Sequence, residues 1–343
     1  MARTAVVLFN LGGPDRPEAV EPFLYNLFSD PSIIGLPGWL RRFVARRISR
    51  RRAPTARRIY AELGGGSPLL PNTEAQARAL EARLSGAEGE LRVFPCMRYW
   101  HPMSDAVARA VREFDPATVV LLPLYPQFST TTTGSSVRVW REAAAAAGLE
   151  APTRLVCCYP SAAGFVAAAA ELVRGALDEA GPGARVLFSA HGLPKRIVAK
   201  GDPYQEQVER TAAAIAAAAE LAPGSWVVCY QSRVGPLEWI GPATDAEVRR
   251  AGADRVPVVM APIAFVSEHS ETLVELDIEY RRLATASGVP RYVRVPTVGT
   301  HPRFIDALAG LVRDALNDDR ATRSEIGGRL CSPGRAGCIN GGR

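Results

Sequence analysis

Short apolar runs alternate along most of the chain with alanine-rich segments that favour helices. Most of the runs lack a clean alternation of apolar and polar residues, which is typical of parallel strands covered on both faces. We expect eight strands, at residues 5–10, 91–97, 118–125, 153–159, 185–190, 226–231, 255–264 and 292–296. Helical segments lie between them, among them residues 74–84, 104–114, 164–180 and 205–221. This order predicts an α/β fold with an open, mostly parallel sheet.

We divide the eight expected strands into two groups of four at about Glu150, and the fourth strand, at 153–159, begins just past this boundary. In each group the first strand ends in a glycine-containing turn, NLGGP at 10–14 and SAHGLP at 189–194. The third strand of each group leads into a polar segment that contains proline, at 125–136 and 261–273. The repeated layout indicates two similar halves.

We therefore predict two Rossmann-like lobes, each a four-stranded parallel sheet flanked by helices. The lobes span residues 1–150 and 151–325, and a tail with cysteines follows at 326–343. Ligands of open α/β sheets bind beyond the carboxyl ends of the strands, so we expect the site in the cleft between the lobes.

The chain of 343 residues is 47% hydrophobic and 22% charged, as is ordinary for a globular enzyme, and its formal charge is +6. No stretch reaches the roughly 18 uninterrupted apolar residues that would span a bilayer. The residues from Met1 to Asn10 favour a strand and not a cleavable leader, which predicts a cytoplasmic chain. The six cysteines are spaced too unevenly for a disulfide scaffold, so reduced thiols or metal ligands are the better interpretation.

His191 directly follows the apolar strand RVLFSA and precedes a turn with Gly192 and Pro194. A histidine at the carboxyl end of a strand is presented to a cleft. Its ordinary pKa of about 6.5 lets it accept a proton or bind a metal at neutral pH. An isolated histidine in a turn usually only makes hydrogen bonds to its neighbours. Here a run of acids later in the chain favours a chemical role.

That run contains Glu271, Glu275 and Glu279, which a helix would carry along one face. Like charges at this spacing repel each other by roughly 0.2–0.5 kcal/mol per pair. A solvated acidic face explains Glu279, but Glu271 lies close behind the apolar run VPVVMAPIAFV. We expect the row to relay protons outward or to conduct a dication inward. Together, His191 and Glu271 would make an open site that suits Fe2+ but is too sparse to hold it tightly.

Eight segments of the chain resemble, in the same order, the signature segments of the ferrochelatase family. They cover nearly the whole chain, from about residue 5 to 315, and they are NLGGP (10–14), GGGSPL (64–69), MRYWHP (97–102), YPQFSTTTTGSS (125–136), SAHGLP (189–194), GDPY (201–204), QSRVGPLEWIGP (231–242) and SEHSETLVELDIEY (267–280).

The resemblance implies a chelatase-like fold and the insertion of ferrous iron, a substrate, into protoporphyrin IX to give protohaem. It implies that His191 and Glu271 are the active-site pair and bind the metal, with His191 accepting the protons that the pyrroles lose. Glu275 and Glu279 resemble the family's proton or metal path, on a helix widened by a π-type turn. The wall that holds and bends the porphyrin corresponds to Arg98, Tyr99, Ser129 and Trp239.

The chain departs from the animal members at Leu11, where they have a methionine, and at Thr130, where they have a cluster-binding cysteine. Leu11 is placed among the porphyrin-binding residues. Some ferrochelatases hold a [2Fe–2S] cluster, which usually requires four thiolates. The candidate ligands here are Cys158, Cys331 and Cys338, with Cys157 as a fourth. A tail whose cysteines have no such role explains the sequence equally well.

Residues 31–61 contain no acid, and they carry arginine at 41, 42, 46, 47, 50, 51, 52, 57 and 58. Apolar residues such as Trp39 and Leu40 are interleaved with these arginines. A solvated basic helix is the plain interpretation, and nothing beyond charge supports nucleic acid as a partner. We favour a lip that touches the inner membrane peripherally and admits a hydrophobic porphyrin, which favours protoporphyrin over coproporphyrin.

Three alternatives stay open. The first is a related chelatase that inserts cobalt or nickel into another tetrapyrrole; such enzymes are generally shorter and lack an arginine-rich lip. The second is a haem carrier without catalysis, which would have no use for a row of acids. The third is a nucleotide-binding protein, but the chain lacks the G-x-G-x-x-G pattern.

Overall fold

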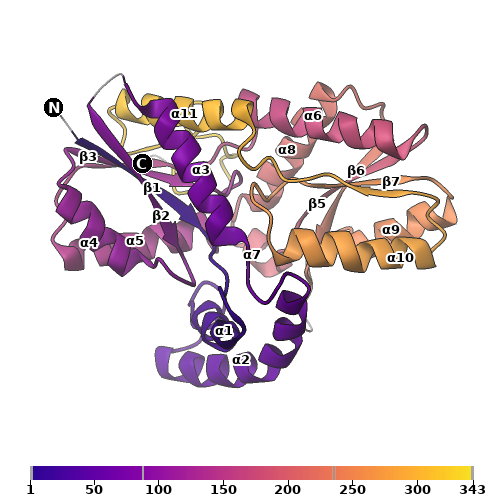
Figure 1. Cartoon of the computed structure of the whole chain (residues 1–343), viewed down its shortest axis with the longest axis horizontal. Coiled ribbons are helices and arrows are strands. Elements are labelled where there is room, and N and C mark those ends of the chain that lie inside the picture. The colour runs from indigo at the N-terminus through magenta and orange to yellow at the C-terminus, as the bar shows by residue number, and fades with distance from the viewer. Residues whose placement is uncertain (1–2, 87–88, 234, 236, 341–343) are drawn as a thin grey trace. The chain divides into compact units, whose positions relative to one another are not determined.

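The computed structural model describes residues 3–86, 89–233, 235 and 237–340 (Figure 1). Val234 and Pro236 of the segment 231–242, and residues 341–343 of the expected tail, lie outside these ranges. Contacts divide the chain into two compact units. Unit 1 contains Met1–Cys158 and Leu308–Gly328, and unit 2 contains Tyr159–Ala307 and Arg329–Arg343.

Unit 1 is built on a five-stranded parallel sheet of order β2-β1-β3-β4-β9. The strands are β1 (Arg3–Asn10), β2 (Glu90–Met97), β3 (Thr118–Pro123), β4 (Thr153–Val156) and β9 (Thr322–Arg323). In β1 the residues from Ala5 to Asn10 are all buried, because helices cover both faces of a central parallel strand.

The helices of unit 1 include a pair that carries the basic segment. The helices are α1 (Val20–Phe28), α2 (Gly38–Ala61), α3 (Leu69–Leu84), α4 (Ser104–Phe114), α5 (Thr133–Ala147) and the last part of α11 (Pro302–Leu316), and a 3-10 turn, η1 (Pro17–Ala19), precedes α1. The long helix α2 packs against α1 (Figure 1). Phe23 and Tyr60 join this pair to Trp100 in one buried cluster. Among the described helices, none has both the length and the hydrophobicity that a bilayer crossing requires.

Unit 2 contains a four-stranded parallel sheet of order β6-β5-β7-β8. Its strands are β5 (Arg185–His191), β6 (Trp226–Gln231), β7 (Val258–Pro262) and β8 (Tyr292–Arg294). Its helices are α6 (Ala163–Ala180), α7 (Lys195–Ala199), α8 (Tyr204–Ala218), α9 (Thr244–Ala253), the π-helix η2 (Glu271–Glu279) and α10 (Tyr280–Ala286).

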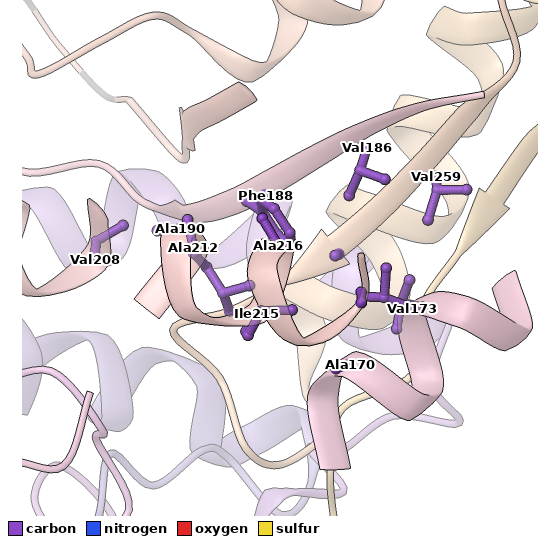
Figure 2. Packing of buried hydrophobic residues seen from close by; sticks show 14 of the residues in the cluster. Ala170, Val173, Val186, Phe188, Ala190, Val208, Ala212, Ile215, Ala216 and Val259 are labelled. Carbon is purple, nitrogen blue, oxygen red and sulfur yellow. The ribbon is translucent and has the colours of Figure 1, made fainter. Parts of the chain in front are cut away.

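The two faces of the central strand β5 are buried in different clusters, because successive side chains of a strand point to opposite faces. Phe188 lies in the cluster formed with α6 and α8, where Figure 2 shows it near Ala216. Leu187 lies in the other cluster, with Val248 of α9 and Leu276 of η2. Both faces therefore hold β5 in place up to its last residue, His191.

The prediction of two parallel sheets flanked by helices is confirmed, but the first sheet has five strands where we expected four. The additional strand, β9, is two residues long, too short to leave an apolar run in the sequence. The first unit also extends past Glu150 to Cys158, because β4 pairs with β3 and so belongs to the first sheet.

We expect Phe188→Ala to destabilise the protein by about 3–5 kcal/mol, because Phe188 is fully buried and the substitution leaves a cavity in a packed core. The measurement is a urea unfolding curve, which gives the midpoint and the free energy of unfolding of each variant. Phe43→Ala is the matched control, since Phe43 is 64% exposed. Equal midpoints for the two variants would contradict the expected packing.

Candidate active site

His191 is the last residue of β5, and the strand ends directly before Gly192. A Cβ atom at Gly192 would lie 2.8 Å from the Gln231 carbonyl oxygen, closer than packing allows, so glycine is required there. The Gly192 N–H donates to the same oxygen at 2.8 Å, which ties the turn to the end of β6. The His191 side chain remains 42% exposed. A buried strand thus presents an imidazole that solvent can reach.

Glu271 faces this imidazole from the first position of the π-helix η2. Its Oε2 atom lies 2.8 Å from His191 Nδ1, and its side chain is 24% exposed. An ionised carboxylate can only accept, so Nδ1 carries the shared hydrogen and Nε2 is left for another partner. The start of η2 is itself held in place, because the Thr272 hydroxyl donates to Glu268 and Glu268 pairs with Arg294 at 2.9 Å.

The second acid of the row, Glu275, lies next to Ser232 just beyond β6. The Ser232 N–H donates to Glu275 Oε1 at 2.9 Å, and the Ser232 hydroxyl makes a short hydrogen bond to Glu275 Oε2. The same hydroxyl lies 3.3 Å from Glu271 Oε2. Gln231 and Tyr280 also donate to Glu275, each at 3.3 Å. Glu279, at the far end of η2, is exposed.

The charges of these groups influence one another. Burial alone would lower the pKa of His191, but the negative charge of Glu271 and the hydrogen bond to it raise that pKa above 6.5. Burial would raise the pKa of Glu271, but the positive charge of His191 outweighs it and lowers that pKa. Burial and the charge of Glu271 raise the pKa of Glu275. The row therefore holds an ion pair at its inner end and a readily protonated acid next to it.

Ser232 is the residue of this group that the sequence analysis missed. It lies in the segment 231–242, but no role was assigned to it. One signal was available: it directly follows a strand in the same way that the turn of His191 does. In the sheet, β5 and β6 pair in register, with His191 beside Gln231, which brings Ser232 close to the pair.

In unit 1, Arg98 and Tyr99 both contact one buried carboxylate, that of Asp30. Arg98 donates to it at 2.7 Å and the Tyr99 hydroxyl at 2.8 Å. Burial would raise the pKa of Asp30, but the charge of Arg98 lowers it. Ser129 is 1% exposed, and its hydroxyl oxygen lies 2.9 Å from the hydroxyl oxygen of Thr131. Leu11 is partly buried against the cluster of α1 and α2.

In unit 2, Trp239 lines an open cavity of about 720 Å³ together with Lys195 and Arg335, and neither His191 nor Glu271 lines it. The Trp239 indole nitrogen is buried, and the structure describes no hydrogen-bond partner for it.

The four candidate cysteines form two pairs. Cys157 and Cys158 are buried in unit 1, with their sulfur atoms 3.4 Å apart. In unit 2, Gln207 donates to the sulfur of Cys331 at 3.1 Å. A hydrogen bond with Cys331 and one with the backbone of Asn340 lower the pKa of Cys338 to about 6.

The fold is one of parallel sheets flanked by helices, and an imidazole and a carboxylate are in contact at the carboxyl end of strand β5. Solved structures support the fold. The chain resembles SirB from Bacillus subtilis with Fe3+, with a TM-score of 0.53 and 14% identity over 92% of this chain and 97% of that one. It also resembles the sirohydrochlorin chelatase SirB from Bacillus subtilis subspecies spizizenii in complex with cobalt, with a TM-score of 0.52 and 12% identity over 93% and 97% of the two chains.

Sequence comparison identifies the family. The Ferrochelatase family model matches residues 3–316. The chain is 54% identical to a ferrochelatase of Caulobacter vibrioides over 98% of this chain and 97% of that protein. It is 55% identical to a ferrochelatase of Phenylobacterium zucineum over 99% of both. The chain belongs to the ferrochelatase family, the enzymes that insert iron into a porphyrin.

We expect Glu271→Gln to lower the pKa of His191, because the substitution removes the negative charge that stabilises the imidazolium. An NMR titration of the histidine ring protons measures this pKa, and His191→Ala assigns the signal among the four histidines. Glu279→Gln, at the exposed end of the same helix, is the control and should leave the pKa of His191 unchanged. A pKa that stays unchanged or rises in Glu271→Gln would refute the electrostatic coupling.

Proposed function

We propose that this chain inserts ferrous iron into protoporphyrin IX to form protohaem, with His191 as the proton acceptor and Glu271 as its partner in metal delivery and proton exit. The observation that carries the proposal is the 2.8 Å contact between His191 Nδ1 and Glu271 Oε2. Coproporphyrin, or another tetrapyrrole, is the alternative substrate.

The pair suits a base that must receive protons repeatedly. A porphyrin loses two pyrrole protons when a metal dication enters it. His191 can take a proton at Nε2 while Nδ1 donates to Glu271, and the carboxylate stabilises the imidazolium that forms. One imidazole and one carboxylate also give Fe2+ only a partial ligand set, so the ion can be passed on.

Glu275 and Glu279 extend the pair toward solvent along η2. Glu275 is partly buried with a raised pKa, and Glu279 is exposed. A proton that leaves Glu271 would therefore meet an acid that binds it readily and then one in contact with water. We assign this row to proton exit, or to iron entry in the opposite direction.

For the porphyrin itself we retain Leu11, Arg98 and Trp239 as contact residues. Trp239 supports this assignment with a buried indole N–H for which the described residues provide no hydrogen-bond partner. Arg98 supports it with a side chain that Asp30 holds in place. Tyr99 and Ser129 are each 1% exposed, so we place them behind the contact surface as its support.

We expect His191→Ala to reduce iron insertion by roughly a hundredfold or more, the range that a positioned proton acceptor contributes. Porphyrin affinity should stay close to that of the unchanged protein. The assay is anaerobic incubation with Fe2+ and either protoporphyrin IX or coproporphyrin, followed by visible absorption, with porphyrin fluorescence reporting binding. His101→Ala is the matched control, since His101 is an exposed histidine of unit 1. Undiminished turnover in His191→Ala would remove the proposed base.

We further propose that the basic segment 31–61, which contains α2, forms a lip that binds an anionic bilayer. Trp39 is 75% exposed and Phe43 is 64% exposed, and their four-residue spacing puts both on one side of α2. Exposed arginines at 42, 46 and 47 lie among them. Aromatic side chains insert at the boundary of head groups and acyl chains, and each arginine near anionic lipid adds about 1 kcal/mol. A surface of this kind supports delivery of a hydrophobic porphyrin from the bilayer, which favours protoporphyrin over coproporphyrin as the substrate.

Trp39→Glu combined with Phe43→Glu should weaken binding to phosphatidylglycerol vesicles, because the apolar anchor is lost and the added charges repel the lipid. Vesicle sedimentation measures the bound fraction. Ile326→Glu is the control, because Ile326 is also 64% exposed but lies outside the basic segment. Equal sedimentation of the double variant and the unchanged protein would disprove the lip.

The residues do not fit a [2Fe–2S] cluster as the structure arranges them. Such a cluster requires four thiolates in one place. Within the described residues, no three or more His, Cys, Asp or Glu side chains gather in a way that could hold a metal ion. No step of the proposed reaction therefore passes through a cluster.

A further inference from the structure

Ser232 has an unusual backbone and an unusually placed hydroxyl. Its φ is 59°, in the left-handed region that serine rarely adopts. In this conformation its N–H and its hydroxyl both point to Glu275, which accepts both. A backbone held in a disfavoured conformation beside reactive groups is a reason to look for a function.

The Ser232 hydroxyl lies between two carboxylates. It makes a short hydrogen bond to Glu275 Oε2 and lies 3.3 Å from Glu271 Oε2. A hydroxyl has one hydrogen to donate and two lone pairs with which to accept. It can therefore donate to one carboxyl while it accepts a hydrogen bond from the other, whenever that other carboxyl is protonated.

The hydrogen bonds of the described residues thus form a continuous chain. His191 Nδ1 contacts Glu271 Oε2 at 2.8 Å, Glu271 contacts the Ser232 hydroxyl, and that hydroxyl contacts Glu275. The two glutamates are joined through Ser232. The serine oxygen thus supplies a hydrogen-bonded route from Glu271 to Glu275.

We propose that the Ser232 hydroxyl is the proton bridge between Glu271 and Glu275. The inference rests on the proposed function of His191 as proton acceptor. The imidazolium proton passes from His191 Nδ1 to Glu271 Oε2. The proton of Glu271 then moves to the Ser232 oxygen while the hydroxyl proton of Ser232 moves to Glu275 Oε2. Ser232 ends the step as a neutral hydroxyl, His191 as a neutral imidazole that keeps the hydrogen on Nε2, and Glu275 holds the proton.

The test compares Ser232→Gly with Ser232→Ala. Glycine adopts a positive φ without strain, so Ser232→Gly removes the hydroxyl and leaves the turn intact. Ser232→Ala removes the hydroxyl and keeps the Cβ atom. We expect both variants to lower kcat for iron insertion by roughly a hundredfold, the lower end of what a positioned proton-transfer group contributes. The porphyrin KM should not change, and the solvent deuterium isotope effect on kcat should change in both.

Ser225→Gly is the matched control, because Ser225 precedes β6 at its opposite end and its hydroxyl donates to the Ala222 carbonyl oxygen. An unchanged kcat in Ser232→Gly would overturn the bridge, even if kcat falls in Ser232→Ala. A change of the porphyrin KM in either variant would overturn it as well. His191→Ala separates the two ideas. If it is active, the proposed function fails; if it is inactive while Ser232→Gly is fully active, only the bridge fails.

Discussion

The contact between His191 and Glu271 requires that the end of strand β5 lies beside the start of the π-helix η2. His191 is held because β5 is buried on both faces, by the clusters that contain Phe188 and Leu187. Glu271 is held because Thr272 and Glu268 fix the start of η2. A shift of one residue in either element would move these side chains away from each other. The packing of unit 2 therefore serves to keep one imidazole and one carboxylate at hydrogen-bond distance.

The electrostatics of the row follow from this contact. Two partly buried carboxylates four residues apart repel each other, and the repulsion is relieved in different ways at the two positions. Glu271 stays ionised because the imidazolium compensates it, whereas Glu275 is pushed toward the protonated form. The two carboxylates therefore differ in their affinity for a proton, and Glu275 has the higher affinity. The π-helix suits the arrangement, because both carboxylates reach the same serine.

The sequence was informative where a pattern is long or a residue is chemically distinctive. The buried strand before His191 and the spacing of the three glutamates could be recognised without coordinates, and both lie where we expected them. The strand β9 could not be recognised, because two residues carry no periodic pattern. The boundary of the first unit was also hidden, because β4 begins just past Glu150 and its pairing with β3 leaves no mark in the local pattern.

The alternation of strands and helices, the family and the candidate pair follow from local patterns and motifs, because these depend on residue type and spacing along the chain. The role of Ser232 depends on the register of β5 against β6, which places residues about forty positions apart beside each other. The burial of Tyr99 and its bond to Asp30 likewise arise from packing between segments. Contacts of this kind are decided by how elements assemble in space, and a single sequence does not encode them in any local signal.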